Sequence, residues 1–426
     1  MGARTTMNEL ASYLPVLQWP PVPGLVFWFA LALSAGALLG GAIFRVLGLP
    51  RIIGYSAAGM GVAALGGGIS DGSDGLLPPT ERLIVDLALA LLLFELGSRV
   101  NLRWLRVNLA LLVTSAAESL LGFWVIFAGL RAFDFAPQTA MAGAAVLGVA
   151  AAAVIGRVAT EYKSAGQVTE RMIVLSALNT LYAVLLLKMV VGWLHLDQHS
   201  DWVQGLVEPL YTFFGSLLLA GLLSMAVNTV LRRFDLKDEN SVLLLLGLVL
   251  LALTGALLLG LSTLLVPLLA GVMMRNASER PCIWPRHFGT AGGVLVLMMF
   301  VIVGSAWSVP ALTLGAGMAL ALLAARLLGK ALVLVAMAPL SGIELRQGLA
   351  LALTLTPVSV TSLVLLADLH ATQPAVAAPL VPVVLSAVAL MALLGPVLVH
   401  AGLHLAGEHR SAGTESVSPA RVKETR

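Results

Sequence analysis

The chain has 426 residues, of which 59% are hydrophobic and 11% are charged, and its formal net charge at pH 7 is +3. Soluble domains carry about 25% charged residues, so this composition excludes an ordinary soluble protein and favours a lipid-embedded bundle of helices. A single cysteine, Cys282, excludes a disulfide framework and a cysteine-based metal cluster. No basic run with interleaved aromatic residues occurs, so we expect no nucleic-acid binding.

Apolar runs of about 17 to 25 residues or longer recur along the chain, separated by charged or Pro- and Gly-rich breaks. The two runs that meet at Gly260 can also be read as one long span. We predict about thirteen transmembrane spans, at roughly 24–46, 51–67, 82–98, 107–131, 138–160, 171–194, 205–231, 241–259, 261–275, 288–306, 309–338, 346–369 and 375–405.

These spans predict a transmembrane transporter domain at 24–405. Residues 1–23 precede it as an extracytoplasmic segment, and residues 406–426 follow it as a short polar tail. The tail is rich in Ser, Glu, Thr and Arg, a composition typical of disorder.

Basic residues gather in alternate loops between the predicted spans. The basic loops carry Arg45, Arg51, Arg99, Arg103, Arg106, Arg157, Lys163, Arg171, Arg232, Arg233, Lys237, Arg275, Arg280, Arg286 and Arg346. The opposite loops and the N-terminal segment carry only Arg4, Arg82 and Arg131. The positive-inside rule therefore places the N-terminus outside and the C-terminal tail in the cytoplasm. We expect the protein to lie in the cytoplasmic (inner) membrane of a bacterium. An odd number of spans also lets two halves insert in opposite senses, as in inverted-repeat transporters.

Two of the spans contain residues that interrupt helices. In the twelfth span, Pro357 lacks a backbone N–H, and the Ser and Thr hydroxyls at 354–362 can satisfy the backbone groups that it frees. A simple proline kink fits these residues equally well. In the fifth span, Gly148 precedes a run of small residues at 149–153, which suits either a crossing of two backbones or tight helix packing.

Several short motifs follow one another in a fixed order. They are Leu-Pro-Arg-Ile-Ile-Gly-Tyr at 49–55 with Ala58-Gly59, Leu-Leu-Leu-Phe-Glu-Leu-Gly at 91–97 with Leu102-Arg103, Leu-Leu-Ala-Gly at 268–271, Phe-Val-Ile-Val-Gly at 300–304 and Leu-Gly-Lys at 328–330. No single motif is specific. In this order and spacing, however, the chain resembles the bacterial monovalent cation:proton antiporters, which include the sodium/proton and potassium-efflux exchangers.

The resemblance implies an all-α polytopic fold of about thirteen helices, built as an inverted repeat with crossing interrupted helices at the fifth and twelfth spans. It implies a homodimer in which a core domain moves against a dimerisation domain. The implied partners are a monovalent cation, the proton and the lipid bilayer, without a cofactor. In this family the sixth helix carries an Asp-Asp or Asn-Asp pair, whose second aspartate exchanges the proton and the cation.

The chain departs from the family at this pair, which reads Asn179-Thr180. Neither an amide nor a hydroxyl titrates near neutral pH, so proton coupling must come from elsewhere or be absent. Polar side chains in an apolar helix need protein partners or a solvated cavity. The neutral oxygens that we expect to bind a cation belong to Asn179, Thr180, Thr356, Ser359 and Thr361.

Four charged residues are candidates for proton coupling or charge pairing. Glu118 lies near the middle of the fourth span, where a charge is costly, and it is either a hydrogen-bonded structural group or a proton carrier. Lys330 matches the family's basic residue in the eleventh span, together with the deeper Arg326. Lys330 is either neutral or paired with Glu118 or Glu95. Glu95 lies four residues before Arg99, so a helix-end ion pair is the favoured interpretation there.

These observations leave three functions open. The first is exchange of Na⁺ or K⁺ for H⁺ by alternating access with an atypical ion site. The second is transport of another solute on the same fold, and the third is a non-transporting sensor or scaffold. We expect no enzymatic activity, because no nucleophile–base–acid constellation occurs. We expect no metal site either, since His400 and His404 have no evident third ligand.

Overall fold

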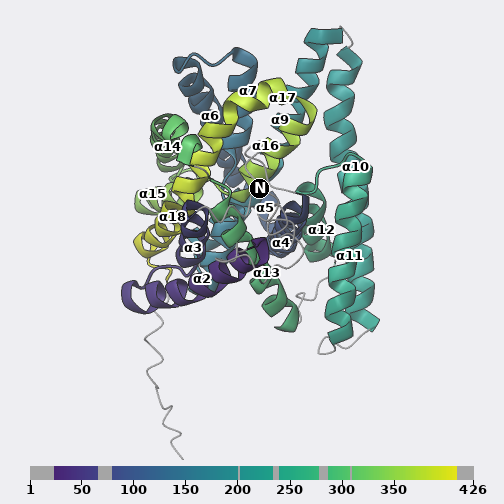
Figure 1. The fold of residues 1–426 in the computed structure, drawn as a ribbon. Helices are drawn as coiled ribbons and strands as arrows, with labels where there is room; N and C mark the ends of the chain where they lie inside the picture. The colour runs from purple at the N-terminus through teal and green to yellow at the C-terminus, as the bar shows by residue number, and fades with distance from the viewer. Residues whose placement is uncertain are drawn as a thin grey trace, which may run out of the picture.

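The computed structural model describes residues 24–65, 79–199, 202–233, 239–277, 286–307 and 309–409, and every regular element in these ranges is a helix (Figure 1). Segment 1–23 and most of the predicted tail lie outside the described residues, so the predicted domain boundaries stay predictions. In chain order the helices are α2 (Leu25–Leu47), α3 (Ile52–Ala64), α4 (Pro79–Ser98), α5 (Leu102–Val107), α6 (Leu109–Ala132), α7 (Pro137–Gly148), α8 (Ala152–Glu161), α9 (Gln167–His199), α10 (Trp202–Arg233), α11 (Glu239–Leu258), α12 (Leu265–Ala277), α13 (Arg286–Ser305), α14 (Val309–Ala336), α15 (Leu345–Leu355), α16 (Val360–Thr372), α17 (Pro374–Ala377), η2 (Ala378–Leu380) and α18 (Val381–Ala406).

The chain is an all-helical, polytopic membrane protein. In the described part of the chain, seven helices are long and apolar enough to cross a bilayer, and the bent pair α15–α16 raises this number to eight. Shorter apolar helices, among them α3 and α12, accompany them. Each predicted span contains at least one helix of the structure, and the total of thirteen crossings stays a prediction.

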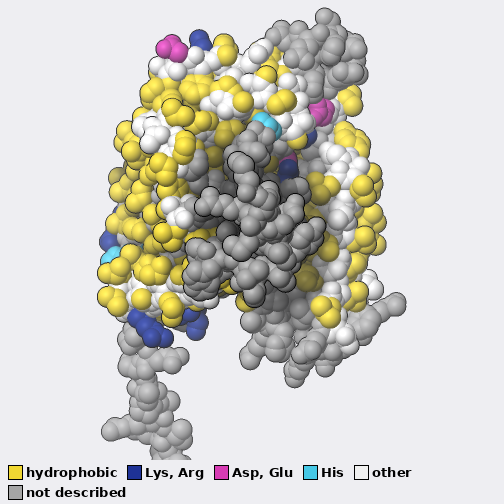
Figure 2. Space-filling model, viewed as in Figure 1, with side chains coloured by type: hydrophobic (Ala, Val, Ile, Leu, Met, Phe, Trp, Pro, Cys, Tyr) yellow, Lys and Arg dark blue, Asp and Glu magenta, His cyan; other side chains and the backbone are white. Residues whose placement is uncertain are grey.

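The outer surface of the bundle is apolar. Figure 2 shows hydrophobic side chains over most of the described part of one face, with Lys and Arg gathered near one end. Large side chains such as Leu38, Leu218 and Leu328 are more than two-thirds exposed. A soluble protein would bury such side chains, whereas a bilayer solvates them.

The buried side chains form three clusters. The largest unites α4, α6–α9 and α14–α18 with parts of α12 and α13, the second unites α4 with α10–α12, and the third joins α2, α3 and α13. Figure 1 shows α10 and α11 on one side of the molecule and α14 and α15 on the other. Helices α4 and α12 both belong to the two large clusters, so they link them.

Contact between α4 and α12 depends on two glycines. A side chain at Gly97 would overlap the backbone carbonyl of Leu268, and one at Gly271 would overlap that of Phe94. Small residues let membrane helices approach this closely. The backbones of α4 and α12 are therefore in tight contact at these two glycines.

Candidate functional site

Two broken helices meet inside the largest cluster. The first break separates α7 from α8 at residues 149–151, and the second separates α15 from α16 at residues 356–359. The halves of the second span are bent by 48°. Pro357 lies in this break, and its carbonyl oxygen accepts a hydrogen bond from the backbone N–H of Ala151 at 2.9 Å. The two breaks are thus joined directly, a geometry that a simple proline kink does not produce.

The guanidinium of Arg326 enters this crossing from α14 and is 1% exposed. Its Nε donates to the carbonyl of Thr356 at 2.8 Å, and one Nη donates to that of Val149 at 2.9 Å. Further hydrogen bonds reach the carbonyls of Leu147 and Leu355. These acceptors lie at the C-terminal ends of α7 and α15, where carbonyls lack helical partners and the helix dipole is negative. Arg326, a candidate for proton coupling or charge pairing in the sequence analysis, therefore stabilises two helix ends.

The side chain of Asn179 joins α9 to the crossing and to α6. Its Oδ1 accepts a hydrogen bond from the backbone N–H of Ala150 at 2.6 Å. Its Nδ2 donates to the Ser119 hydroxyl at 3.0 Å and to Glu118 Oε2 at 3.3 Å. Because the amide has both a donor and an acceptor end, it serves a backbone N–H and a carboxylate at once. An aspartate at this position would lack the donor.

Glu118 and Lys330 form an ion pair in which both side chains are 1% exposed. Lys330 thus has a carboxylate partner, Glu118, which is one of the two partners, Glu118 and Glu95, named in the sequence analysis. It lies on α14 one turn after Arg326, so α14 brings both buried cations to the centre of the bundle. A buried pair is costly to split, because removal of one partner leaves an uncompensated charge.

The predicted oxygen ligands fall into two groups. The hydroxyls of Thr180 and Thr356 donate to the carbonyl one turn earlier in their own helices, at 2.9 and 2.6 Å. The hydroxyl oxygens of Ser359 and Thr361 are buried and have no hydrogen-bond partner in the described structure. Both flank the start of α16, so the second break leaves two oxygens available for a ligand.

Comparison with known proteins identifies the family. Residues 33–401 match the family model described as "Sodium/hydrogen exchanger, transmembrane". The chain belongs to this family. The cation:proton antiporters are a family of membrane transporters and not of enzymes. A search of the curated proteins found no match.

Two solved structures have the same fold as this exchanger. One is the sodium proton antiporter MjNhaP1 from Methanocaldococcus jannaschii at pH 8, with 17% identity and a TM-score of 0.62 over 90% of this chain and 99% of that chain. The other is the electron-microscopy structure of MjNhaP1, with 16% identity and a TM-score of 0.64 over 91% and 98% of the two chains. At these identities the likeness establishes the fold alone.

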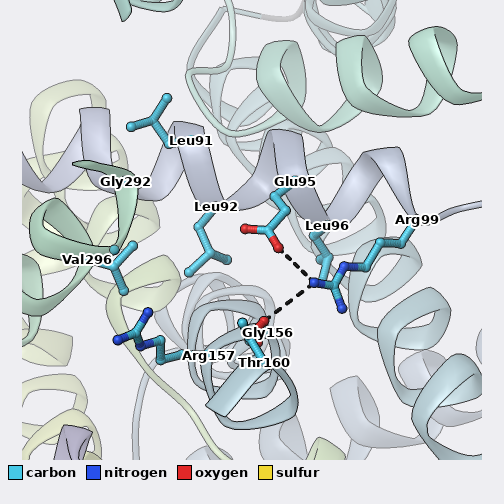
Figure 3. Close-up of a pocket in the computed structure, with 11 residues that line it drawn as sticks. Leu91, Leu92, Glu95, Leu96, Arg99, Gly156, Arg157, Thr160, Gly292 and Val296 are labelled. Carbon is cyan, nitrogen blue, oxygen red and sulfur yellow. Dashed lines mark hydrogen bonds and ion pairs between the residues drawn. The ribbon is translucent and has the colours of Figure 1, made fainter. Parts of the chain in front are cut away.

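Glu95 of this exchanger does not join the crossing. It lies on a cavity of about 160 Å³ between α4, α8 and α13 (Figure 3). Its carboxylate accepts a hydrogen bond from Arg99 at 2.7 Å, and Arg99 also donates to Thr160 of α8 at 3.4 Å. This ion pair at the end of α4 is the one that the spacing of four residues indicated.

Sequence reasoning missed one charged residue, Asp368 on α16. Its carboxylate pairs with Arg82 of α4 at 2.5 Å, and Arg82 also lies 3.6 Å from Asp86, four residues further along α4. Arg82 is one of the few basic residues on its side of the predicted topology. A search for acidic residues at span ends on that side would have found Asp368.

Proposed function

We propose that this exchanger moves Na⁺ or K⁺ across the bacterial cytoplasmic membrane in exchange for protons, by alternating access. The N-terminus lies outside and the C-terminus in the cytoplasm, and the chain acts as a homodimer. One observation carries the proposal: the buried Glu118–Lys330 pair is hydrogen-bonded through Asn179 to the crossing of the broken helices. A titratable pair therefore stands beside the backbone segment at which such transporters bind their ions.

In the proposed exchange, one cation replaces one proton at the Glu118–Lys330 pair. In the proton-loaded state, the Glu118 carboxylate is neutralised by the Lys330 ammonium. A monovalent cation that binds the carboxylate takes over this neutralisation, and Lys330 then loses one proton because an unpaired ammonium is unfavourable in the membrane interior. Return of a proton to Lys330 restores the pair and expels the cation. One cation is exchanged for one proton, and the charge of the site is the same in both states.

The neutral oxygens complete the cation site in this proposal. Ser359 and Thr361 supply hydroxyls with no present partner, and Thr180 has acceptor capacity left after donating to its own helix. Asn179 holds the crossing and the carboxylate in register. Arg326 keeps its positive charge throughout, because it stabilises the ends of α7 and α15.

The second candidate is transport of another solute, or a non-transporting sensor or scaffold, on the same fold. The observation that favours it is the buried hydroxyl of Thr180 at the family's aspartate position. Substitution Thr180→Asp separates the two candidates. It converts a protein without exchange into an exchanger only if the rest of the ion site is intact.

A pH-gradient dye assay in everted vesicles or proteoliposomes tests the proposal. Addition of Na⁺, K⁺ or Li⁺ to vesicles with an acidic interior is expected to dequench the dye. Glu118→Gln and Lys330→Gln should abolish the response, while Asp134→Asn, which removes an exposed carboxylate between α6 and α7, should retain it. Absence of dequenching with all three cations between about pH 6 and 9 would contradict the proposal.

A further inference from the structure

A second polar cavity lies between the two large clusters, away from the Glu118–Lys330 pair. Its volume is about 580 Å³, and it is lined by residues of α4, α9, α16 and the segment that leads from α11 to α12. We name it the Asp86–Asp368 vestibule after the carboxylates that line it. None of the ion-site residues that the resemblance suggested lines it.

The charges of the vestibule do not cancel. Arg82 contacts both carboxylates, with its Nε 3.6 Å from Asp86 Oδ2 and one Nη 2.5 Å from Asp368 Oδ1. Lys188 also lines the vestibule, and it pairs with Glu208 at 3.4 Å. Once this second pair is set aside, two carboxylates share one guanidinium. Counted with Glu208, which lies outside the lining, three carboxylates stand against two cations, so the formal charge around the vestibule is one negative charge in excess.

Two buried oxygens in the vestibule have no hydrogen-bond partner among the residues that the structure describes. They are Oδ1 of Asp86 and Oγ1 of Thr263, in side chains that belong to residues only 6% and 5% exposed. A buried carboxylate oxygen without a donor costs free energy unless a ligand satisfies it. Carboxylate and hydroxyl oxygens are hard ligands that suit alkali and alkaline-earth cations. Thr263 comes from the α12 side and Asp86 from α4, so the two oxygens approach the vestibule from different elements.

We propose that the Asp86–Asp368 vestibule is a binding site for one monovalent cation, with Asp86, Asp368 and Thr263 as its oxygen ligands. The single excess negative charge matches a monovalent cation, whereas a divalent cation would leave a positive charge in the site. The identity of the cation rests on the proposed exchange, because the vestibule then holds the transported ion at the mouth of its route. Binding at the vestibule is measurable without any transport.

The test is thermal unfolding of the purified full-length protein in detergent, at constant ionic strength, with Na⁺, K⁺ or Li⁺ titrated against N-methyl-D-glucamine. A cation that binds the folded state raises the midpoint as its concentration rises. In the Glu118→Gln/Lys330→Gln background, where the proposed exchange site does not contribute to the shift, Asp86→Asn and Asp368→Asn should increase the half-stabilising concentration by at least about tenfold, as expected when a charged ligand is removed. Asp134→Asn, which removes a carboxylate outside the vestibule, should leave it unchanged.

Two further variants make the result decisive. Thr263→Val keeps the shape and every charge of the vestibule, so it answers the question if an aspartate variant fails to fold, and we expect an increase of about fivefold. Glu118→Gln should retain the cation-dependent shift while it abolishes exchange in vesicles, so failure of the proposed exchange is distinguishable from failure of this site. The site is refuted if no cation raises the midpoint, if the vestibule variants respond like the parent, or if only Glu118→Gln removes the shift.

Discussion

The side-chain Oδ1 of Asn179, on α9, accepts a hydrogen bond of 2.6 Å from the backbone N–H of Ala150, which lies in the break between α7 and α8. The Asp-Asp or Asn-Asp pair of the family lies on this helix, and here the amide at its first position joins the broken stretch of backbone to a buried ion pair. The second position, Thr180, bonds only its own helix. The exchange chemistry that we propose has therefore moved from α9 to Glu118 of α6 and Lys330 of α14.

Replacement of Asn179 by alanine should destabilise the fold. The Ala150 N–H would lose its acceptor in a buried site, at a cost of about 1–3 kcal/mol. The thermal midpoint of the purified protein in detergent measures this loss. Thr180→Ala is the matched control, because its hydroxyl only donates to its own helix, and its midpoint should stay close to that of the parent. Equal midpoints for Asn179→Ala and the parent would show that the hydrogen bond from Ala150 to Asn179 does not stabilise the fold.

Arg326 should tolerate no replacement, including lysine. Its guanidinium reaches carbonyls at the ends of two helices, and a lysine cannot present the same planar set of donors. We expect Arg326→Lys to lower the thermal midpoint strongly and Arg326→Gln to lower it further. The loss in free energy of unfolding for Arg326→Gln should be about 3–5 kcal/mol, as is typical when a buried charge loses its partner. A stable, active Arg326→Lys protein would contradict this account of the crossing.

A double-mutant cycle on Glu118 and Lys330 separates their structural role from their role in exchange. Each single substitution, Glu118→Gln or Lys330→Gln, leaves one buried charge alone and should cost about 3–5 kcal/mol. The double substitution removes both charges and should recover most of the stability, but it should show no exchange. Additive effects on the thermal midpoint would mean that the two side chains do not form a pair.

Glu408 should stabilise the start of α9. Its carboxylate accepts hydrogen bonds from the N–H groups of Val168 and Thr169 at 2.8 and 2.7 Å and from the Thr169 hydroxyl at 2.8 Å. A carboxylate that caps a helix N-terminus contributes about 1 kcal/mol. Glu408→Ala should therefore accelerate hydrogen exchange at the first turn of α9 and leave α14 unaffected. Unchanged exchange at Val168 and Thr169 would disprove the cap.

Much of the fold could be predicted from the sequence, because the length of each apolar run and the positions of the charged residues indicate the membrane spans. Pro357 and Gly148 marked the two breaks for the same reason, since their backbone properties are local. The contact between the breaks, through Ala151 and Pro357, was not predictable from either residue alone. Only the resemblance suggested it.

The partners of the buried charges were less accessible to sequence reasoning. Lys330 had two candidate carboxylates, Glu118 and Glu95, and the choice depends on how α6 packs against α14. Arg326 was a candidate for charge pairing, and its actual partners could not be predicted because carbonyl oxygens at helix ends carry no sequence signal. Asp368 meets Arg82 only through the packing of α16 near α4.

Proton release on cation binding tests the central claim most directly. Purified full-length protein in weakly buffered detergent solution, with a pH-indicating dye, is mixed with saturating Na⁺ or K⁺. If the cation displaces the Lys330 ammonium from Glu118, about one proton per chain is released, and Lys330→Gln releases none. Release that is unchanged in Lys330→Gln would show that the proton comes from another group.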